Sequence, residues 1–191
     1  MRVLVACEYS GTVRDAFKSR GHDAWSCDLL PSDTPGQHIV GDVLGLLHDG
    51  WDLMIAHPPC THLAVSGARH FARKIADGSQ QAALAFVQQL LDAPVPRIAL
   101  ENPVSIISTR IRKPDQIIQP WMFGHCESKA TCLWLKGLPQ LRRTQVMTKP
   151  SGGWLNTTPS GQNKLGPSPD RWKLRSKTYS GIAEAMAEQW G

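Results

Sequence analysis

The sequence predicts an α/β fold in which a mostly parallel sheet is covered by flanking helices. Three short apolar runs have the length and composition of buried parallel strands: residues 2–6, 53–56 and 97–100. Apolar residues at helical spacing separate these runs, most clearly over residues 12–20 and 77–91. Strands that alternate with helices in this way connect into parallel βαβ units, so we expect one continuous sheet.

The first βαβ unit is the most complete. Apolar residues at helical spacing, ending at Gly21, predict a helix over residues 12–20. Residues 22–27 form the next predicted strand and lead into Asp28. An acid about twenty residues beyond the first turn is typical of nucleotide-binding βαβ units, although the turn at residues 7–11 is poor in glycine.

The later elements are shorter. A brief strand at residues 38–40 runs into Asp42, which either belongs to a site or caps a short helix at residues 43–47. Residues 105–123 show no periodicity and are expected to be loop. The last predicted elements are a strand and an amphipathic helix, at residues 129–135 and 179–190.

Length and charge describe one domain with an appended basic segment. The chain has 191 residues and a net charge of +5. Residues 142–177 hold eight basic residues and one acid, which gives them +7 and leaves −2 for the rest. This segment favours a polyanionic partner, with a solvated loop as the alternative. Its tryptophans, Trp154 and Trp172, could stack on bases or pin the loop to the core.

The cellular compartment is inferred from the membrane-spanning and signal segments that the sequence does not show. No apolar run has membrane-spanning length and no signal peptide is evident, so we expect a cytoplasmic protein. Its five cysteines have no framework spacing and are expected to be reduced. A zinc site is not predicted, because the candidate ligands lack paired spacing: His57, Cys60, His62, Cys126 and Cys132.

Two strand ends carry reactive side chains. At the first, two prolines stop the apolar run 53–56 and stiffen the turn that presents Cys60. Open α/β sheets bind ligands at the carboxyl ends of their strands, so Cys60 is either a nucleophile or a small buried hydrophobe. At the second, Glu101 follows the run 97–100. Burying a carboxylate without a partner is costly, so Glu101 is either functional or a capping or salt-bridge residue.

Taken together, these stretches resemble the DNA cytosine-carbon-5 methyltransferase family. The family has a loop after its first strand, acids after the second and third, Pro-Pro-Cys after the fourth and Glu-Asn after the fifth. The matching residues are 7–11, Asp28, Asp42, Pro58-Pro59-Cys60 and Glu101-Asn102. Ser180-Gly181-Ile182, at the start of the last helix, is similar to the family's final motif. The resemblance covers residues 1–135 and 178–190, and is greatest to small bacteriophage and prophage members without a large target-recognition domain.

The resemblance implies a Rossmann-like, S-adenosylmethionine-dependent methyltransferase fold in three parts. Residues 1–141 would form the catalytic α/β core. Residues 142–177 would stand in the place of a target-recognition region, and residues 178–191 would form a helix that packs back on the core. A phage-encoded protein of this kind would act in the host cytoplasm, as restriction-modification enzymes do.

The family's chemistry implies specific roles for two side chains. Carbon 5 of cytosine is a weak nucleophile until a thiolate, here Cys60, adds to carbon 6. Glu101 would bind ring nitrogen 3 and the 4-amino group, a role that favours a raised carboxyl pKa. S-adenosylmethionine would supply the methyl group, and Cys60 would leave as carbon 5 loses its proton. Because carbon 6 is covered in a stacked duplex, the cytosine must be flipped out or unpaired.

The resemblance also implies binding residues. Asp28 would hold the cofactor ribose and Asp42 its adenine amino group. The full set of implied cofactor contacts is Tyr9, Ser10, Gly11, Asp28, Asp42, Pro58 and Gly181. The DNA contacts are expected from basic residues, which are Arg110, Arg112, Lys129, Lys164, Arg171 and Lys173.

The chain departs from the family at several points, and each departure keeps an alternative open. Gly11 is the only glycine of the first loop, which favours a non-catalytic DNA-binding protein that has lost its cofactor. Thr61 stands where the family has glutamine, and residues 142–177 are short for target recognition. The small size permits a methyltransferase of free cytosine nucleotides, or recognition through a partner subunit. Enzymes that methylate amino groups fit less well, because they carry an aromatic residue in place of Cys60.

Overall fold

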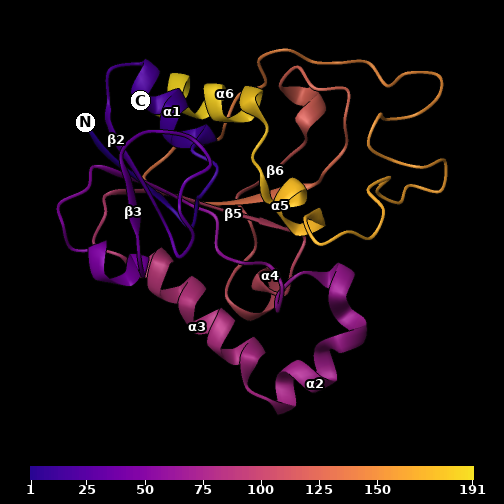
Figure 1. Cartoon of the computed structure of the whole chain (residues 1–191), viewed down its shortest axis with the longest axis horizontal. Helices are drawn as coiled ribbons and strands as arrows, with labels where there is room; N and C mark the ends of the chain where they lie inside the picture. The colour runs from indigo at the N-terminus through magenta and orange to yellow at the C-terminus, as the bar shows by residue number, and fades with distance from the viewer.

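The computed structural model describes all 191 residues and contains one seven-stranded sheet (Figure 1). The strand order is β3-β2-β1-β4-β5-β7-β6. The strands are β1 (Arg2–Ala6), β2 (Asp23–Asp28), β3 (His38–Val40), β4 (Leu53–Ala56), β5 (Arg97–Pro103), β6 (Gln116–Ile118) and β7 (Thr131–Lys136). Strands β1 to β5 are parallel, and β7 is antiparallel to both β5 and β6. The predicted α/β class, with a mostly parallel sheet and flanking helices, is therefore confirmed.

Helices cover both faces of this sheet (Figure 1). The α-helices are α1 (Thr12–Ser19), α2 (Phe71–Ala76), α3 (Ser79–Asp92), α4 (Ile107–Arg110), α5 (Arg171–Ser176) and α6 (Ser180–Trp190). Three short 3₁₀ helices are η1 (Val43–Leu46), η2 (Val65–His70) and η3 (Pro120–Met122). No helix is long and apolar enough to cross a membrane.

Alternation along the strands produces two separate apolar layers. In β1, Val3 and Val5 point to the face covered by α1 and α6, while Leu4 and Ala6 point to the face covered by α3. Both sets are fully buried, which is why the central strands read as continuous apolar runs. The C-terminal helix α6 packs beside α1, and its Trp190 indole N–H donates to the carbonyl of Pro139.

The structure corrects several local expectations. Helix α3 ends one residue beyond the predicted limit, and η2 and α2, which were not predicted, precede it. Residues 105–123, expected to be loop, contain α4, β6 and η3. The basic segment contains α5. Elements of three to six residues are too short to show a hydrophobic period, so only tertiary contacts define them.

The connections reverse direction between β1 and β4. From β1 the chain moves outward through α1 to β2, and from β4 it moves the opposite way through α3 to β5. Ligands of open α/β sheets bind at such a reversal, outside the carboxyl ends of the strands. The segments that begin at Cys7 and His57 therefore border the expected crevice, and the amide of His57 donates to the carbonyl of Ala6 at 2.9 Å.

Candidate active site at the carboxyl edge of the sheet

The turn after β4 is held against the end of β5. Strand β4 stops at Ala56, whose partner is Leu100, whereas β5 continues to Pro103 along β7. Asn102 is buried, and its Nδ2 donates to the carbonyl of Pro58 at 2.9 Å. This bond fixes the first proline of the turn and sets Glu101 beside the residues that precede Cys60.

The segment after Cys60 is also anchored. Amide groups of Leu63 and Ala64 donate to the carbonyl of Cys60 at 3.0 and 2.9 Å. The buried ammonium of Lys74 donates to the carbonyl of Thr61, and Gln80 Nε2 donates to the backbone carbonyl of His62 at 3.3 Å. Helices α2 and α3 thus position the turn, which keeps the thiol from sampling many orientations.

Glu101 forms an ion-pair contact with His57. Nδ1 of His57 lies 3.3 Å from Oε2 of Glu101, and the two side chains are 10% and 18% exposed. Burial acts to raise the carboxyl pKa, but the His57 hydrogen bond, together with the charges of Lys129 and His57, holds it below the usual value. The expectation of a raised pKa is wrong for this conformation, because the sequence did not show that two basic side chains would face Glu101.

Cys60 has the opposite shift. Burial raises the pKa of its thiol, and the negative charge of Glu101 raises it further. Lys129, the backbone N–H of Cys60 and Arg175 act in the other direction without cancelling these effects. The thiolate that the addition requires is therefore not the resting form, because the thiol keeps its proton at neutral pH. A nucleophilic Cys60 requires a proton acceptor or an additional positive charge when substrate and cofactor are bound.

Buried polar atoms without a partner concentrate at this edge. Five buried side-chain nitrogen or oxygen atoms make no hydrogen bond in the chain, and four of them follow β4 or lie at and after the end of β5. They are His57 Nε2, His62 Nδ1, Asn102 Oδ1 and Ser105 Oγ, and the fifth is Arg171 Nε of α5. Native structures pair nearly all such atoms, so this clustering is typical of a site that binds a polar ligand.

The buried polar groups of the loop after β1, in contrast, form hydrogen bonds within the chain. The carboxylate of Glu8 is buried and accepts from the amides of Val13 and Arg14, at 2.7 and 3.2 Å, at the N-terminus of α1. Ser10 Oγ also donates to Glu8, at 3.2 Å. Nucleotide-binding folds often place an anionic ligand group at this helix end. Here a carboxylate already fills it, which disfavours a diphosphate ligand.

Gly11 and Arg14 connect this loop to the chain beyond β2. Gly11 has a φ of 73°, and a Cβ there would collide with the side chains of Thr34 and Arg14. The guanidinium of Arg14 is fully buried and donates to five groups of the following loop and strand. Its acceptors are Ser26 Oγ, Ser32 Oγ, the Thr34 carbonyl and hydroxyl, and the Pro35 carbonyl. Gly11 is required by this close packing, whatever ligand the loop binds.

The acids after β2 and β3 lie near the end of β1. Burial, followed by the negative charges of Asp28, Cys27 and Asp42, raises the pKa of Cys7 to about 12. One oxygen of Asp28 accepts from the amide of Leu30, and one oxygen of Asp42 accepts from that of Leu44, each at 3.0 Å. Asp42 is therefore the N-cap of η1, as its alternative interpretation predicted.

These carboxylates fit the group that the family resemblance implies. The second oxygen of Asp28 and that of Asp42 make no hydrogen bond in the chain, so both can accept from ribose hydroxyls or an amino group. Asp28 and Asp42 would hold S-adenosylmethionine at this edge.

Helix α5 lies across the same edge. Tyr9 is buried, and its hydroxyl donates to the carbonyl of Lys173 at 2.9 Å. Lys129 Nζ donates to the carbonyl of Arg175 at 2.9 Å. Lys177 forms a 2.8 Å ion pair with Asp33. Helix α5 therefore connects the loop after β1 with the segment before β7, and brings the charge of Arg175 near Cys60.

Other predicted contacts lie elsewhere or have structural partners. The amide of Gly181 donates to His125 Nε2 at 3.0 Å, and a Cβ at Gly181 would collide with the Phe123 carbonyl. Arg110 and Lys164 are exposed. Lys173 lies 6.0 Å above the Tyr9 ring, and Arg171 belongs to the same helix α5.

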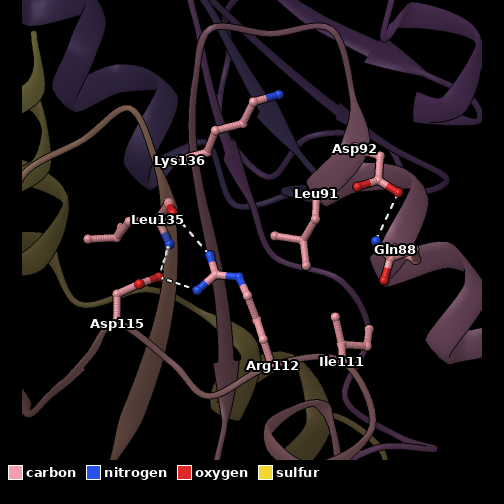
Figure 2. Close-up of a pocket in the computed structure, with 8 residues that line it drawn as sticks. All are labelled: Gln88, Leu91, Asp92, Ile111, Arg112, Asp115, Leu135 and Lys136. Atoms are coloured by element: carbon pink, nitrogen blue, oxygen red, sulfur yellow. Dashed lines mark hydrogen bonds and ion pairs between the residues drawn. The ribbon is translucent and has the colours of Figure 1, made fainter.

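Arg112 is directed away from Cys60. Its guanidinium lies 2.7 Å from Asp115 and donates to the carbonyl of Leu135 at 3.0 Å, beside a cavity of about 620 Å³ (Figure 2). Leu135 pairs with Ala99 in the amino-terminal half of β5, two residues before Glu101. This cavity is separate from the strand ends that carry Cys60 and Glu101. No three His, Cys, Asp or Glu side chains converge to hold a metal ion.

Sequence reasoning did not identify several residues of this edge. They are Glu8, Arg14, His57 and Arg175 as functional or supporting groups, and Asn102 in any role beyond its place in the Glu-Asn motif. Position alone could have indicated three of them, because Glu8, His57 and Asn102 each lie within two residues of a strand end that was already predicted to be functional. Arg175 gave no local signal, since its location depends on how α5 returns to the sheet.

Comparisons with known proteins found matches among solved structures only. No protein-family model matches the chain, and no curated protein matches it. Among solved structures, the chain is similar to a prophage-encoded Escherichia coli protein described as a DNA modification methyltransferase, with 13% sequence identity and a TM-score of 0.48. The alignment covers 78% of this chain and 52% of the other, so the chain spans about half the length of that protein. Similarity at this level supports no transfer of function.

Proposed function

We propose that the chain is an S-adenosylmethionine-dependent DNA methyltransferase that acts on carbon 5 of cytosine through a covalent bond to Cys60. The observation that carries the proposal is that the turn after β4, which holds Cys60, is bonded to Asn102 next to Glu101 in the neighbouring strand β5, where four of the five unpartnered buried polar atoms lie. This edge lies at the reversal between β1 and β4, where open α/β sheets bind ligands.

The opposite pKa shifts set the protonation states from which the reaction starts. Cys60 keeps its proton in the resting state, while Glu101 is ionised. As the sulfur bonds to carbon 6, the thiol proton passes to Glu101, and Glu101 donates it to ring nitrogen 3. The electron pair of the carbon 5–carbon 6 bond then becomes available at carbon 5. Lys129 and His57 face Glu101, so they stabilise its negative charge before and after the transfer.

The second half of the reaction reverses the addition. S-adenosylmethionine, when bound, supplies an electrophilic methyl group. After carbon 5 has gained a methyl group, it loses its proton to a base. The electron pair of that carbon–hydrogen bond re-forms the carbon 5–carbon 6 double bond, and sulfur leaves carbon 6 with the electron pair of the carbon–sulfur bond. Ring nitrogen 3 returns its proton to Glu101. The anchoring of residues 61–64 keeps the sulfur close to carbon 6 throughout.

Covalent trapping tests this function directly. DNA that carries 5-fluorocytosine at many positions is incubated with the protein and S-adenosylmethionine, because fluorine blocks the final elimination. We expect a denaturation-resistant adduct that is absent with Cys60→Ala and retained with Cys126→Ala, which removes another half-buried thiol. Duplex and single-stranded DNA and free 5-fluorocytidine nucleotides are compared in parallel.

The alternatives give different outcomes. The raised pKa of Cys60 is the observation that keeps a non-catalytic DNA-binding protein as the alternative. Binding of DNA without any adduct would support that alternative and contradict our proposal. An adduct with nucleotides but not with DNA would instead identify a nucleotide methyltransferase.

A further inference from the structure

Two tryptophans form a stacked pair outside the core. The rings of Trp121 and Trp154 lie 6.0 Å apart between centroids, with an interplanar angle of 9°. Both side chains are partly exposed. The guanidinium of Arg143 lies 5.6 Å from the centroid of the Trp121 ring. Trp121 belongs to η3, and the other two residues belong to the basic segment.

Backbone hydrogen bonds fix the two rings. Met147 donates to the carbonyl of Trp121 at 2.7 Å, so residues 144–147 run beside η3. Leu155 donates to the carbonyl of Cys126 at 2.9 Å and holds Trp154 from the other side. Main-chain hydrogen bonds therefore hold the two segments that carry the rings, and the rings do not need to be buried for the segments to keep their positions.

The stacked pair differs from the tryptophans of the core. Trp51, Trp134 and Trp190 are 5% exposed or less, and each indole N–H donates to a backbone carbonyl. The indole N–H groups of Trp121 and Trp154 make no such bond. Buried tryptophans normally find a partner for this donor. Its absence argues that the stacked pair is a surface feature and not a device for pinning the loop.

The pair lies at the same edge of the sheet as Cys60. Strands β5 and β6 are both antiparallel to β7, so the carboxyl end of β6, from which η3 begins, faces the same way as that of β5. Asn156 and Ser128 exchange two hydrogen bonds, of 2.9 and 3.0 Å, next to Lys129. Lys129 in turn acts on both Cys60 and Glu101. The basic segment is therefore bonded to the residues that precede β7, at the edge of the sheet where Cys60 and Glu101 also lie.

Charge around the pair is complementary to a polyanion. Residues 142–169 contain four basic residues and no acid. A guanidinium that lies over an aromatic ring keeps its in-plane N–H groups available, and their geometry matches phosphate oxygens. Aromatic rings beside such cations bind single strands by stacking on bases of any sequence. Duplex DNA has its bases stacked internally, so it offers no base to this surface.

We propose that Trp121, Trp154 and Arg143 form a stacking site for an unpaired base of single-stranded DNA, with Arg143 holding the adjacent phosphate. This inference deepens the proposed function, since it names the form of DNA that reaches Cys60. The occupant is a nucleotide that flanks the target, and its base identity is not read. The short basic segment thus contributes affinity for single-stranded DNA without recognising its base sequence.

The test uses a strand that cannot engage Cys60. Binding of a fluorescent thymine-only oligonucleotide, and of an abasic oligonucleotide of equal length, is measured by anisotropy without cofactor. We expect Trp154→Leu to weaken binding of the thymine strand by about 5- to 150-fold, the range measured for base–aromatic stacking. Binding of the abasic strand should not change. Leu155→Ala, which truncates an exposed apolar neighbour, serves as the matched control.

Arg143 has a matched control in the adjacent residue. Arg142 exchanges backbone hydrogen bonds with Gln189 of α6, at 2.7 and 2.9 Å, and does not lie over a ring. We expect Arg143→Gln to weaken binding of the thymine strand more than Arg142→Gln, although both remove one positive charge. Equal effects of the two changes would contradict a specific phosphate contact at Arg143.

The remaining outcomes are decisive. Equal loss of thymine and abasic binding in Trp154→Leu would show that the ring only supports the segment, and would overturn the proposal. Unchanged binding, tighter binding of uracil RNA, or no binding by the unaltered protein would also overturn it. Adduct formation at Cys60 that does not depend on Trp154 would leave the methyltransferase function standing and remove the stacking site. Trp154-dependent binding without an adduct would do the reverse.

Discussion

The loop after β1 and the turn after β4 lie side by side at the reversal of the sheet, yet they differ in how their polar groups are satisfied. Glu8 and Arg14 of the first region bond to backbone and side chains within the chain. In the second region, His57 and Asn102 each leave a buried atom without a partner. Burying a polar atom without a hydrogen bond costs free energy. The first region, whose polar groups are paired within the chain, is therefore a structural joint, and the second is suited to bind a ligand.

The difference teaches that proximity to the crevice does not by itself make a residue functional. Glu8 and Glu101 are both glutamates at the carboxyl edge, and both have low exposure. Glu8 contacts main-chain donors of a helix, whereas Glu101 contacts His57 and faces the Cys60 thiol. The first arrangement stabilises the fold, and the second sets protonation states.

The largest expected effect is the loss of methyl transfer when Glu101 is substituted, which tests whether its role differs from that of Glu8. We expect Glu101→Gln to reduce methyl transfer by about 10²- to 10⁴-fold, because the amide cannot carry the proton between thiol and ring. The free energy of unfolding should change by less than about 1 kcal/mol. Methyl transfer to DNA and urea denaturation are measured on the same preparation. A large loss of stability with little loss of rate would contradict the assignment.

The converse change is Glu8→Ala. It leaves the buried amides of Val13 and Arg14 without their acceptor, so we expect a loss of about 1–3 kcal/mol in unfolding free energy. Urea denaturation measures it. An unchanged midpoint would show that the loop after β1 is not the structural joint described above.

Gly11 separates backbone strain from close packing. Gly11→Ala introduces both a positive φ and a collision with Thr34 and Arg14, whereas Gly21→Ala introduces only a positive φ, of 82°, in open space. We expect Gly21→Ala to cost about 1 kcal/mol. Gly11→Ala should cost more, by roughly a further 1–2 kcal/mol as packing is strained. Equal losses in thermal unfolding would mean that Thr34 and Arg14 move aside freely.

The smallest effect concerns the pH dependence of Cys60 alkylation. Removing the negative charge in Glu101→Gln favours the thiolate, so the pKa of Cys60 falls and alkylation begins at lower pH. Lys129→Gln removes a positive charge and shifts alkylation to higher pH. Peptide mapping by mass spectrometry isolates Cys60 from the other thiols. Shifts in the same direction for both variants would contradict the electrostatic account.

Much of the core was predictable because local pattern and burial agree. Residues 2–6 and 53–56 form strands over those same limits, since a run buried on both faces must be apolar throughout. The prolines before Cys60 end β4 after Ala56, as their missing N–H groups require. The antiparallel pairing of β7 with β5 and β6 was not predictable, because it depends on contacts between residues far apart in the sequence.

The sequence by itself determined the fold class, the ends of β1, β3 and β4 and the residue types that follow them, because each is a matter of composition and period over a few neighbouring residues. It did not show that β5 continues to Pro103, so that Glu101 lies inside the strand. Only the tertiary structure decided the protonation states and the supporting contacts. His57 and Lys129 hold the pKa of Glu101 below its usual value despite burial, and burial together with the nearby charge of Glu101 raises the pKa of Cys60. Electrostatic interactions depend on distance and burial, which a sequence does not give. The contact of α5 with Lys129 and the stacking of Trp121 on Trp154 likewise join residues that no local pattern connects.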